Sequence, residues 1–255
     1  MIQSEIKEGV GKITLTRPDK YHAFVREMAL QLQDVLDKYN DDNVRAVLIT
    51  ASGKAFCAGQ DLLEATDPNG PELTQIVQEH YNPIIRKIRN IEKPIVAAVN
   101  GVAAGAGASI ALCCDIVLAC ESATFIQAFS KIGLIPDSGG TFFLPRLIGM
   151  QKAAALMMTA EPVSAKDAEK MGMIYKVFSD DSFEQESWQL VSKLAGMPTK
   201  GLGLTKRLLN ASYSNNFEEQ LDMEDKCQTI AGNTADFKEG IEAFFEKRKP
   251  NFKGE

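Results

Sequence analysis

The stretch PIVAAVNGVAAGAGASIALCCDIVLAC, residues 94–120, limits the fold of this chain more tightly than any other. Residues 94–101 and 115–120 are rich in β-branched and small apolar side chains, as expected of strands that are buried on both faces. Between them, the small apolar residues 105–114 favour a short buried helix. Two buried strands joined through a helix predict parallel pairing with a right-handed crossover.

The first 139 residues continue this alternation of strands and helices. We predict a hairpin over 2–17 around Glu8-Gly9, a helix over 25–39, a strand over 45–51, a mobile loop over 62–72, a helix over 73–91 and a strand over 123–129. These elements together indicate a layered α/β core.

After Gly139 the sequence becomes mostly helical. Helices are predicted over 140–159, 164–171, 182–195, 200–212, 216–231 and 234–247, with one strand over 173–178. We therefore expect an α/β core of residues 1–195, followed by a C-terminal helical region of residues 196–255. Ile241, Phe244 and Phe245 give the last helix an apolar edge, which must dock on its own core or on a neighbouring subunit.

Composition and charge narrow the class of partner and the cellular location. The chain of 255 residues is 45% apolar and has a formal net charge of 28 − 34 = −6, so nucleic acid and anionic membranes are not the expected partners. No clean membrane span or signal peptide is evident. Five cysteines without a Cys-x-x-Cys pair indicate a reducing, cytoplasmic location, and two histidines offer little for a metal site.

Two loops of small residues follow core strands and carry candidate chemistry. They are KAFCAGQDL, residues 54–62, and NGVAAGAGAS, residues 100–109. The second is not a dinucleotide fingerprint, because Ile110 stands where the third glycine belongs. Each loop alone has a structural interpretation, either a tight corner with Asp61 as a helix cap or the close packing of a buried helix. If the two strands are neighbours, free N–H groups of both loops can converge on one oxygen and form an oxyanion hole.

The stretch GLIPDSGG, residues 133–140, places one carboxylate, Asp137, between a proline and two glycines. Aspartate is common in such turns because its side chain bonds to nearby backbone groups. On the residues alone, a turn or capping role is favoured and a catalytic base stays open.

Six motifs in order resemble the crotonase, or enoyl-CoA hydratase/isomerase, superfamily: ITLTRPDKYHAF, KAFCAGQDL, PIVAAVNGVAAGAGASIALCCDIVLA, FSKIGLIPDSGGTFFLPRLIG, SAKDAEKMGMIYKV and FFEKRKPNF. They cover nearly the whole chain, which looks most like the branch of ring-1,2-epoxyphenylacetyl-CoA isomerases of the phenylacetate pathway. The resemblance implies a crotonase spiral of ββα units with a C-terminal helical region for assembly into a trimer, or a hexamer as a dimer of trimers. The implied partners are an acyl-CoA thioester, other copies of the chain and enzymes of the same pathway. No permanently bound cofactor is implied, since coenzyme A is part of the substrate.

The resemblance also implies roles for backbone groups. The N–H groups of Gln60 and Ala106 would hold the thioester oxygen as it becomes an enolate. Ala23 and Ala58 would contact the adenine through their backbone. His22, which replaces the usual asparagine, is interpreted as a local change rather than a base.

Four further residues are expected near the substrate. Asp61, Leu62 and Gly105 belong to the same two loops, with Asp61 also interpreted as a cap. Lys247 would contact the phosphates of coenzyme A from this chain or from a neighbouring subunit. Its alternative role is to complement the dipole at the end of a helix.

The acid/base residues separate the possible reactions. Hydratases of the superfamily use two glutamates, and Ser109 and Phe129 stand at the matching positions. Asp137 stands where isomerases place a single acid/base carboxylate, and where 4-chlorobenzoyl-CoA dehalogenase carries its nucleophile. An isomerase is therefore implied. The alternatives are a hydratase, a dehalogenase or decarboxylase, and a non-catalytic acyl-CoA-binding protein. Dehalogenation is disfavoured because the single Trp188 lies far along the chain.

The surroundings of Asp137 lead to two further expectations. Burial against Leu134, Ile135, Phe142 and Phe143 is expected to raise the pKa of this carboxyl group. Glu64, Glu79 and His80 lie near the predicted mobile loop and are expected at a solvated surface, with a place in the pocket lining as the alternative. Tyr81 is a candidate to face the acyl group.

Overall fold

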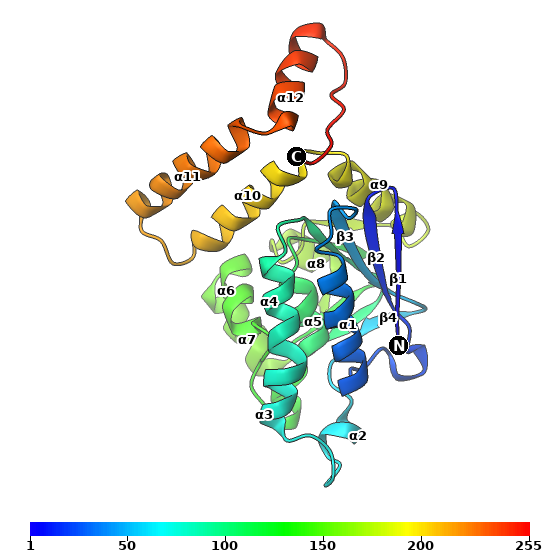
Figure 1. Cartoon of the computed structure of the whole chain (residues 1–255). Helices are drawn as coiled ribbons and strands as arrows, with labels where there is room; N and C mark the ends of the chain where they lie inside the picture. Colours follow the sequence, from blue (N-terminus) through cyan, green and yellow to red (C-terminus); the bar gives the residue numbers. More distant parts are fainter.

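The computed structural model describes residues 1–255 and contains two β-sheets surrounded by helices (Figure 1). The strands are β1 Ile2–Lys7, β2 Val10–Leu15, β3 Ala46–Ala51, β4 Ala55–Cys57, β5 Ile95–Val99, β6 Val102–Ala104, β7 Ile116–Cys120, β8 Thr124–Ile126, β9 Val163–Ser164 and β10 Lys176–Phe178. The helices are α1 Arg26–Lys38, α2 Leu62–Ala65, α3 Leu73–Gln75, the π-helix η2 Ile76–Tyr81, α4 Asn82–Asn90, α5 Ala106–Leu112, α6 Gly140–Ile148, α7 Met150–Thr159, α8 Ala165–Lys170, α9 Phe183–Ala195, α10 Thr199–Ala211, α11 Phe217–Gly232 and α12 Ala235–Glu246. Short 3₁₀ turns cover Pro18–Lys20 and Ala128–Ile132.

The larger sheet has six strands in the order β1-β2-β3-β5-β7-β10. The predicted hairpin is confirmed as the antiparallel pair β1–β2, with Glu8 and Gly9 at positive φ in the turn. All other neighbours in this sheet are parallel, and Val96 of β5 stands opposite Ile116 of β7. Every residue of β5 is buried, as its apolar sequence predicts for a central parallel strand.

The smaller sheet has four strands in the order β4-β6-β8-β9. The pairs β4–β6 and β6–β8 are parallel, and β9 runs antiparallel to β8. The strand-to-helix turns predicted over residues 54–62 and 100–109 contain two short strands, β4 and β6, that were not predicted. These strands are only three residues long, so they show no alternation of polar and apolar residues that could reveal them.

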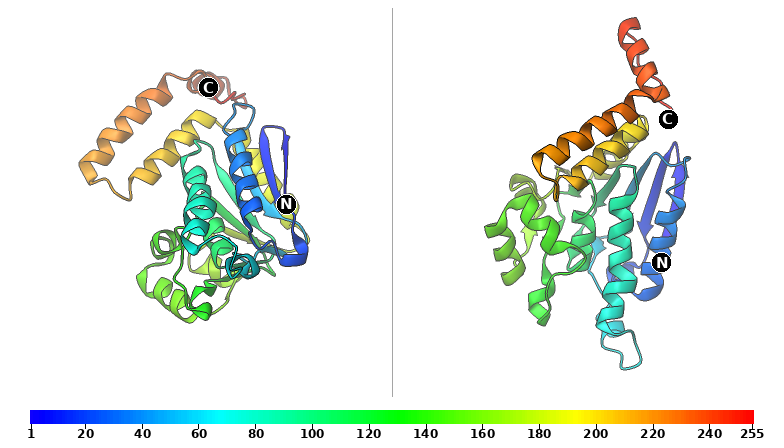
Figure 2. Two further views of the ribbon diagram at one scale, coloured as in Figure 1. Left: turned by 60° about the horizontal axis from the view of Figure 1, so that its bottom comes forward. Right: turned by 60° about the vertical axis from the view of Figure 1, so that its left-hand side comes forward.

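The helices cover both faces of the larger sheet. Helices α1 and α4 pack together on one face, and α9 contacts β2, β3 and β7 on the other (Figure 2). Helix α5 contacts β4, β5 and β6, so this short buried helix joins the two sheets.

Three predicted elements differ in detail from the structure. The expected loop over 62–72 contains the short helix α2, which Asp61 caps by accepting a hydrogen bond from the N–H of Leu63. The expected helix over 73–91 exists as α3, η2 and α4, with a π-helical centre. The expected helix over 140–159 is divided into α6 and α7 at Gly149, whose φ of 80° is costly for other residues.

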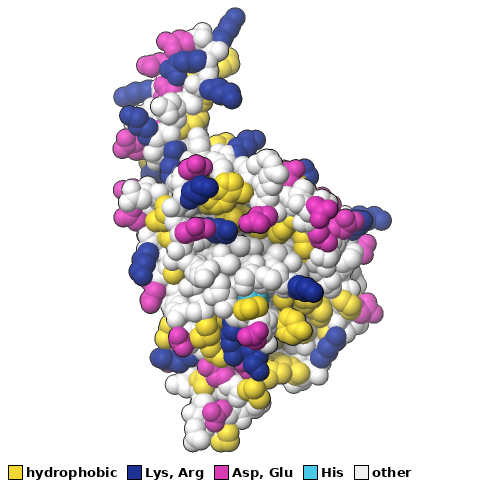
Figure 3. Space-filling model, turned by 90° about the vertical axis from the view of Figure 1, so that its right-hand side faces the viewer, with side chains coloured by type: hydrophobic (Ala, Val, Ile, Leu, Met, Phe, Trp, Pro, Cys, Tyr) yellow, Lys and Arg dark blue, Asp and Glu magenta, His cyan; other side chains and the backbone are white.

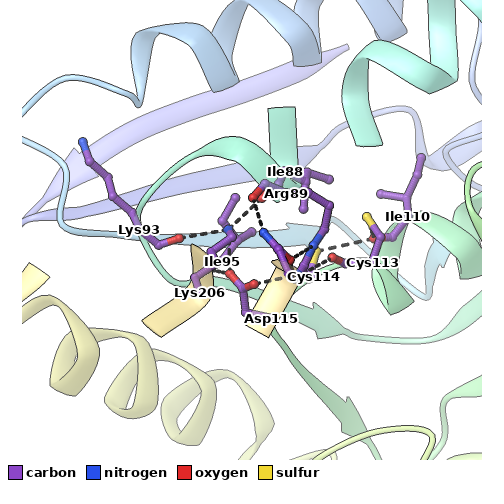
Figure 4. Close-up of polar contacts among 10 residues, drawn as sticks. Ile88, Arg89, Lys93, Ile95, Ile110, Cys113, Cys114, Asp115 and Lys206 are labelled. Carbon is purple, nitrogen blue, oxygen red and sulfur yellow. Dashed lines mark hydrogen bonds and ion pairs between the residues drawn. The ribbon is translucent and has the colours of Figure 1, made fainter. Parts of the chain in front are cut away.

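The C-terminal helices α10, α11 and α12 extend away from the sheets (Figures 1 and 2). Helix α10 is tied to the core by a largely buried ion-pair group, the Asp115 cluster, in which the buried Lys206 and the partly buried Arg89 both contact the partly buried Asp115 (Figure 4). The Asp115 carboxylate lies 2.9 Å from Arg89 and 2.8 Å from Lys206. The expected division at residues 195/196 stays a prediction.

Two further features concern membrane-spanning helices and the state of the cysteines. No helix has both the length and the apolar character needed to cross a lipid bilayer. All five cysteines are buried free thiols.

Candidate functional site

The two loops of small residues lie against each other, as their strands β4 and β6 are parallel neighbours. Gly59 adopts a φ of +94°, and a Cβ placed there would lie 3.1 Å from the oxygen of Ala104 and 3.4 Å from the nitrogen of Ala106. Glycine at this position therefore satisfies both the backbone conformation and the close approach of the second loop.

Gly107 makes the contact between the loops closer still. A Cβ on Gly107 would lie 2.4 Å from the carbonyl oxygen of Cys57 and 2.7 Å from its sulfur. The first turn of α5 can approach β4 only because this residue has no side chain.

Each loop leaves one backbone donor out of the regular hydrogen bonding. The bridge between Phe24 and Gln60 uses the oxygen of Gly59, at 2.7 Å, and the N–H of Asp61, at 2.8 Å. The N–H of Gln60 takes no part in it. Ala106 is the first residue of α5, where N–H groups have no partner within the helix. The pair can therefore serve an external oxygen.

Asp137 lies on the loop that precedes α6. Its carboxylate accepts a hydrogen bond of 2.8 Å from Ser138, and its backbone oxygen accepts one of 2.8 Å from Gly140. Burial raises the pKa of the Asp137 carboxyl group, and the Ser138 hydroxyl opposes that rise. A raised pKa makes a carboxylate a stronger base.

The predicted direction of this pKa shift is confirmed, with burial as its largest cause. Three of the four apolar residues expected around the carboxyl group are largely accessible, with Ile135 81% exposed and Leu134 and Phe142 each 40% exposed. Phe143 is buried beside Gly139. The sequence could not show that the loop turns its apolar residues outward, because the turn depends on Ser138 and Gly139 at positive φ.

Ser109 lies between the second loop and the Asp137 loop. Its Oγ would be 2.8 Å from a Cβ on Gly140, and Oε1 of Gln127 would be 3.7 Å from the same point. Both oxygens are buried and make no hydrogen bond within the protein. Gln127 was not among the predicted site residues, although a polar residue within the apolar run 123–129 was a usable signal.

Phe129, which the resemblance aligns with the second hydratase glutamate, lies close to the second loop. Its ring atoms would lie 3.9 and 4.0 Å from a Cβ on Gly105. The Phe129 side chain is buried and has no proton to exchange, so it cannot act as an acid or base.

The side chain of Gln60 takes part in a chain of hydrogen bonds beside the first loop. The Tyr81 hydroxyl donates to Gln60 Oε1 at 2.9 Å, and Gln60 Nε2 donates to Glu64 at 2.8 Å. Tyr81 is fully buried. His80 is also fully buried, without a hydrogen-bond partner on its ring, so its expected place at a solvated surface is wrong.

The first loop is also bonded to the segment around residue 22. The N–H of Ala58 donates to the oxygen of Tyr21 at 2.9 Å, next to His22 and Ala23. His22 Nε2 lies 2.7 Å from the oxygen of Ser52, and His22 Nδ1 accepts from the N–H of Arg17 at 3.0 Å.

Asp61 and Leu62, two of the expected substrate-binding residues, lie at the start of α2. They differ in whether the side chain is already bonded within the protein. The Asp61 carboxylate caps α2 and pairs with Arg17 at 2.7 Å, so this side chain is engaged within the protein. Leu62, next to it, is 49% exposed and is free to contact a ligand.

Lys247 is not brought to these loops within one chain. It ends α12, at the opposite end of the molecule from α2 (Figure 1). In the space-filling view this end stands out from the body and carries positive and negative side chains among apolar ones (Figure 3). Its expected contact with the phosphates of coenzyme A, and its alternative role at the end of the α12 dipole, both stay predictions.

Comparison with known proteins places this architecture in a family. The enoyl-CoA hydratase/isomerase family model matches residues 5–255. The 1,2-epoxyphenylacetyl-CoA isomerase of Escherichia coli K12 is 45% identical over 99% of this chain and 98% of its own length. A protein of Rhodobacter capsulatus named as a probable enoyl-CoA hydratase is 41% identical over 99% and 98%. The crystal structure of an enoyl-CoA hydratase from Polaromonas sp. JS666 superposes with a TM-score of 0.92 at 34% identity, covering 98% of this chain and 99% of that one.

The chain therefore belongs to the enoyl-CoA hydratase/isomerase, or crotonase, family, and it has the crotonase fold expected from its motifs. It is an enzyme of that superfamily, whose relatives bear both isomerase and hydratase names.

Proposed function

We propose that the protein is an acyl-CoA isomerase that moves a double bond from the 3,4 to the 2,3 position of an acyl group. The observation that carries the proposal is Asp137, a partly buried carboxylate of raised pKa on the loop before α6. The family resemblance supports it, because it implies that Ser109 and Phe129 stand where hydratases have their two glutamates. The nearby carboxylate of Glu64 is already occupied by the N–H of Arg26 and the amide of Gln60.

The reaction would proceed through an enolate held by the two loops. Asp137 removes a proton from the α-carbon, and the electrons of that C–H bond move onto the thioester oxygen. The N–H groups of Gln60 and Ala106 stabilise this negative charge, at about 3 kcal/mol per donor. Protonated Asp137 then returns the proton at the γ-carbon, and the conjugated thioester forms without net gain or loss of atoms.

The same groups suit a ring epoxide. In ring-1,2-epoxyphenylacetyl-CoA, an enolate stabilised by the two donors and a single proton carrier would assist rearrangement to the oxepin. The 45% identity to the E. coli 1,2-epoxyphenylacetyl-CoA isomerase supports this substrate.

We further propose that the active form is a trimer or a dimer of trimers. Phe244 and Phe245 on α12 are 77% and 76% exposed in the single chain, and Ile241 is 44% exposed. A neighbouring subunit would cover this edge and would also bring Lys247 of one chain toward the coenzyme A of another.

Two substrates test the proposed reaction. With a 3-enoyl-CoA, the purified protein should form the conjugated 2-enoyl-CoA, seen as a rise in ultraviolet absorbance. With crotonyl-CoA, little hydration should occur. Rapid hydration together with slow double-bond migration would show instead that the enzyme is a hydratase.

A further inference from the structure

Tyr81 is held in a fully buried position next to the first oxyanion loop. It ends the π-helix η2, and its ring packs on Phe24 with the ring centres 5.9 Å apart. Its hydroxyl donates a hydrogen bond of 2.9 Å to Gln60 Oε1. Tyr81 therefore contacts the loop directly through its hydroxyl group, and its ring packs on Phe24, whose backbone bonds to the loop.

The Gln60 carboxamide is bound at both ends. Oε1 accepts from Tyr81, and Nε2 donates to Glu64 at 2.8 Å. Glu64 in turn accepts from the N–H of Arg26, the first residue of α1, at 2.9 Å. The side chain of Gln60 is thus occupied by the protein, and its backbone N–H is the group left for a ligand.

The backbone on either side of Gln60 is fixed as well. Phe24 donates to the oxygen of Gly59 and accepts from the N–H of Asp61. These bonds position the two flanking peptide groups, and the side-chain bonds restrain rotation of Gln60 between them. The N–H of Gln60 belongs to the same peptide group as the oxygen of Gly59, so the Phe24 bond orients that plane and the Tyr81 bond restrains the side chain attached to it.

We infer that Tyr81 is a positioning residue for the oxyanion hole, acting through the side chain of Gln60 on the direction of its N–H group. This inference rests on the proposed function of the Gln60 N–H. Burial, together with the nearby carboxylates of Asp137 and Glu64, keeps the pKa of Tyr81 well above its usual value. The hydroxyl consequently remains a donor throughout the working pH range.

The Tyr81→Phe variant tests the role, because it removes the donor and keeps the ring against Phe24. Loss of a complete oxyanion donor lowers kcat by roughly a hundred-fold or more, so a misdirected donor should lower it by about three- to thirty-fold. KM for the 3-enoyl-CoA should change little, since the interaction strengthens only in the transition state. The Gln60→Ala variant should lower kcat similarly, and Tyr81→Phe should have no further effect in that background.

A matched control comes from the other end of the core. Tyr39 is buried, and its hydroxyl donates to the oxygens of Glu5, at 2.8 Å, and Lys12, at 3.0 Å. The Tyr39→Phe variant also loses a buried tyrosine hydroxyl, but far from the loops. It should keep the kcat of the unmodified enzyme.

A second readout does not require turnover. When the carbonyl of bound cinnamoyl-CoA is polarised by oxyanion donors, its absorbance band moves to longer wavelength. Tyr81→Phe should reduce this shift, and Tyr39→Phe should retain it.

The outcomes separate the two proposals. If the unmodified protein shows the shift and Tyr81→Phe keeps both the full shift and the full kcat, Tyr81 has no positioning role. Additive losses in the double variant would equally overturn action through Gln60. If the unmodified protein fails to bind cinnamoyl-CoA, or binds it without a shift, the oxyanion pair itself is wrong and the positioning role falls with it.

Discussion

Two groups of buried polar atoms in this molecule differ in how fully they are satisfied. In the Asp115 cluster, the carboxylate binds Arg89, Lys206 and the N–H of Ile95. Lys206 also donates to the oxygens of Ile88 and Lys93 (Figure 4). The oxyanion cluster, made of Gln60, Ala106 and Asp137, instead leaves two N–H groups unused within the chain and a carboxylate that accepts from one neighbouring side chain, Ser138.

This contrast distinguishes polar groups that stabilise the fold from polar groups that can act on a ligand. A buried charge whose hydrogen bonds are all made joins two parts of the chain, because its removal leaves an uncompensated partner. Polar groups that are held in place without partners are free to act on a ligand. The first group should therefore control stability and the second should control activity.

The largest expected effect is in the oxyanion cluster. Asp137→Asn should lower kcat for double-bond migration by about a thousand-fold, because a general base is lost. Its stability at pH 7 should equal or exceed that of the unmodified protein. Burial raises the folded-state pKa of Asp137, so the ionised carboxylate opposes folding above its unfolded pKa. Activity assays and urea unfolding measure both. Full activity in this variant would contradict the single-base mechanism.

The next effect belongs to the Asp115 cluster. Lys206→Met should reduce the free energy of unfolding by about 3 kcal/mol, because Asp115 loses one of its two cationic partners in a buried site. The kcat of the folded fraction should be unchanged.

Lys200→Met serves as the control for Lys206→Met. Lys200 pairs with Glu92 at 3.4 Å and is 42% exposed, so its removal should cost less than about 1 kcal/mol. Urea unfolding of both variants provides the measurement. Equal losses in the two variants would show that the Asp115 cluster contributes no more than a surface pair.

Gly107→Ala should change stability and activity together, since this residue sets the distance between the loops. The added Cβ would lie 2.4 Å from the oxygen of Cys57, and overpacking of this kind costs about 1–3 kcal/mol. Moving α5 away from β4 should also lower kcat. Gly201→Ala on α10 is the control, because its Cβ would meet only Pro198 at 3.8 Å. A Gly107→Ala variant with normal kcat would show that the separation of the donors is not critical.

The smallest effect concerns pH and the support of the first loop. Burial lowers the pKa of His22 below its usual value near 6.5. As the pH falls below 6.5, the unfolded chain binds this proton before the folded one does, so stability declines until the folded pKa is reached. His22→Asn should reduce that decline, by less than about 1.4 kcal/mol per pH unit. His80, whose pKa burial also lowers, should contribute to the decline in the same direction.

Urea unfolding at pH 7 and at pH 5 measures the contribution of His22. Asparagine tolerates the positive φ of 55° at this position, so the substitution should not strain the backbone. An unchanged pH dependence in His22→Asn would rule out this contribution.

Much of the fold could be predicted because its strands and helices have strong local patterns. The hairpin turn at Glu8-Gly9 formed where the sequence indicated it, and α8 and α12 begin within the ranges predicted for them, capped by Ser164 and Thr234. The smaller sheet could not be predicted, because β4 and β6 are held by pairing with each other rather than by residue pattern.

The candidate site was also predictable only in part from the sequence. Small residues in two loops indicated where donors could converge, since glycine and alanine allow close approach. The chain from Tyr81 through Gln60 to Glu64 was hidden, because residues 60 and 81 meet only through the placement of η2. The burial of His80 depends on the same packing.

Helix α5 has a mechanical consequence that follows from its two ends. Its first residue, Ala106, carries one of the two proposed oxyanion donors, and Cys113, directly after its last turn, accepts a hydrogen bond of 2.8 Å from Arg89. At a rise of about 1.5 Å per residue, its seven residues span roughly 10 Å. Helix α5 thus connects Arg89, which belongs to the Asp115 cluster that holds α10, to the place proposed for the substrate oxygen. A displacement of the Asp115 cluster that carries Cys113 with it must either bend α5 or move the N–H group of Ala106.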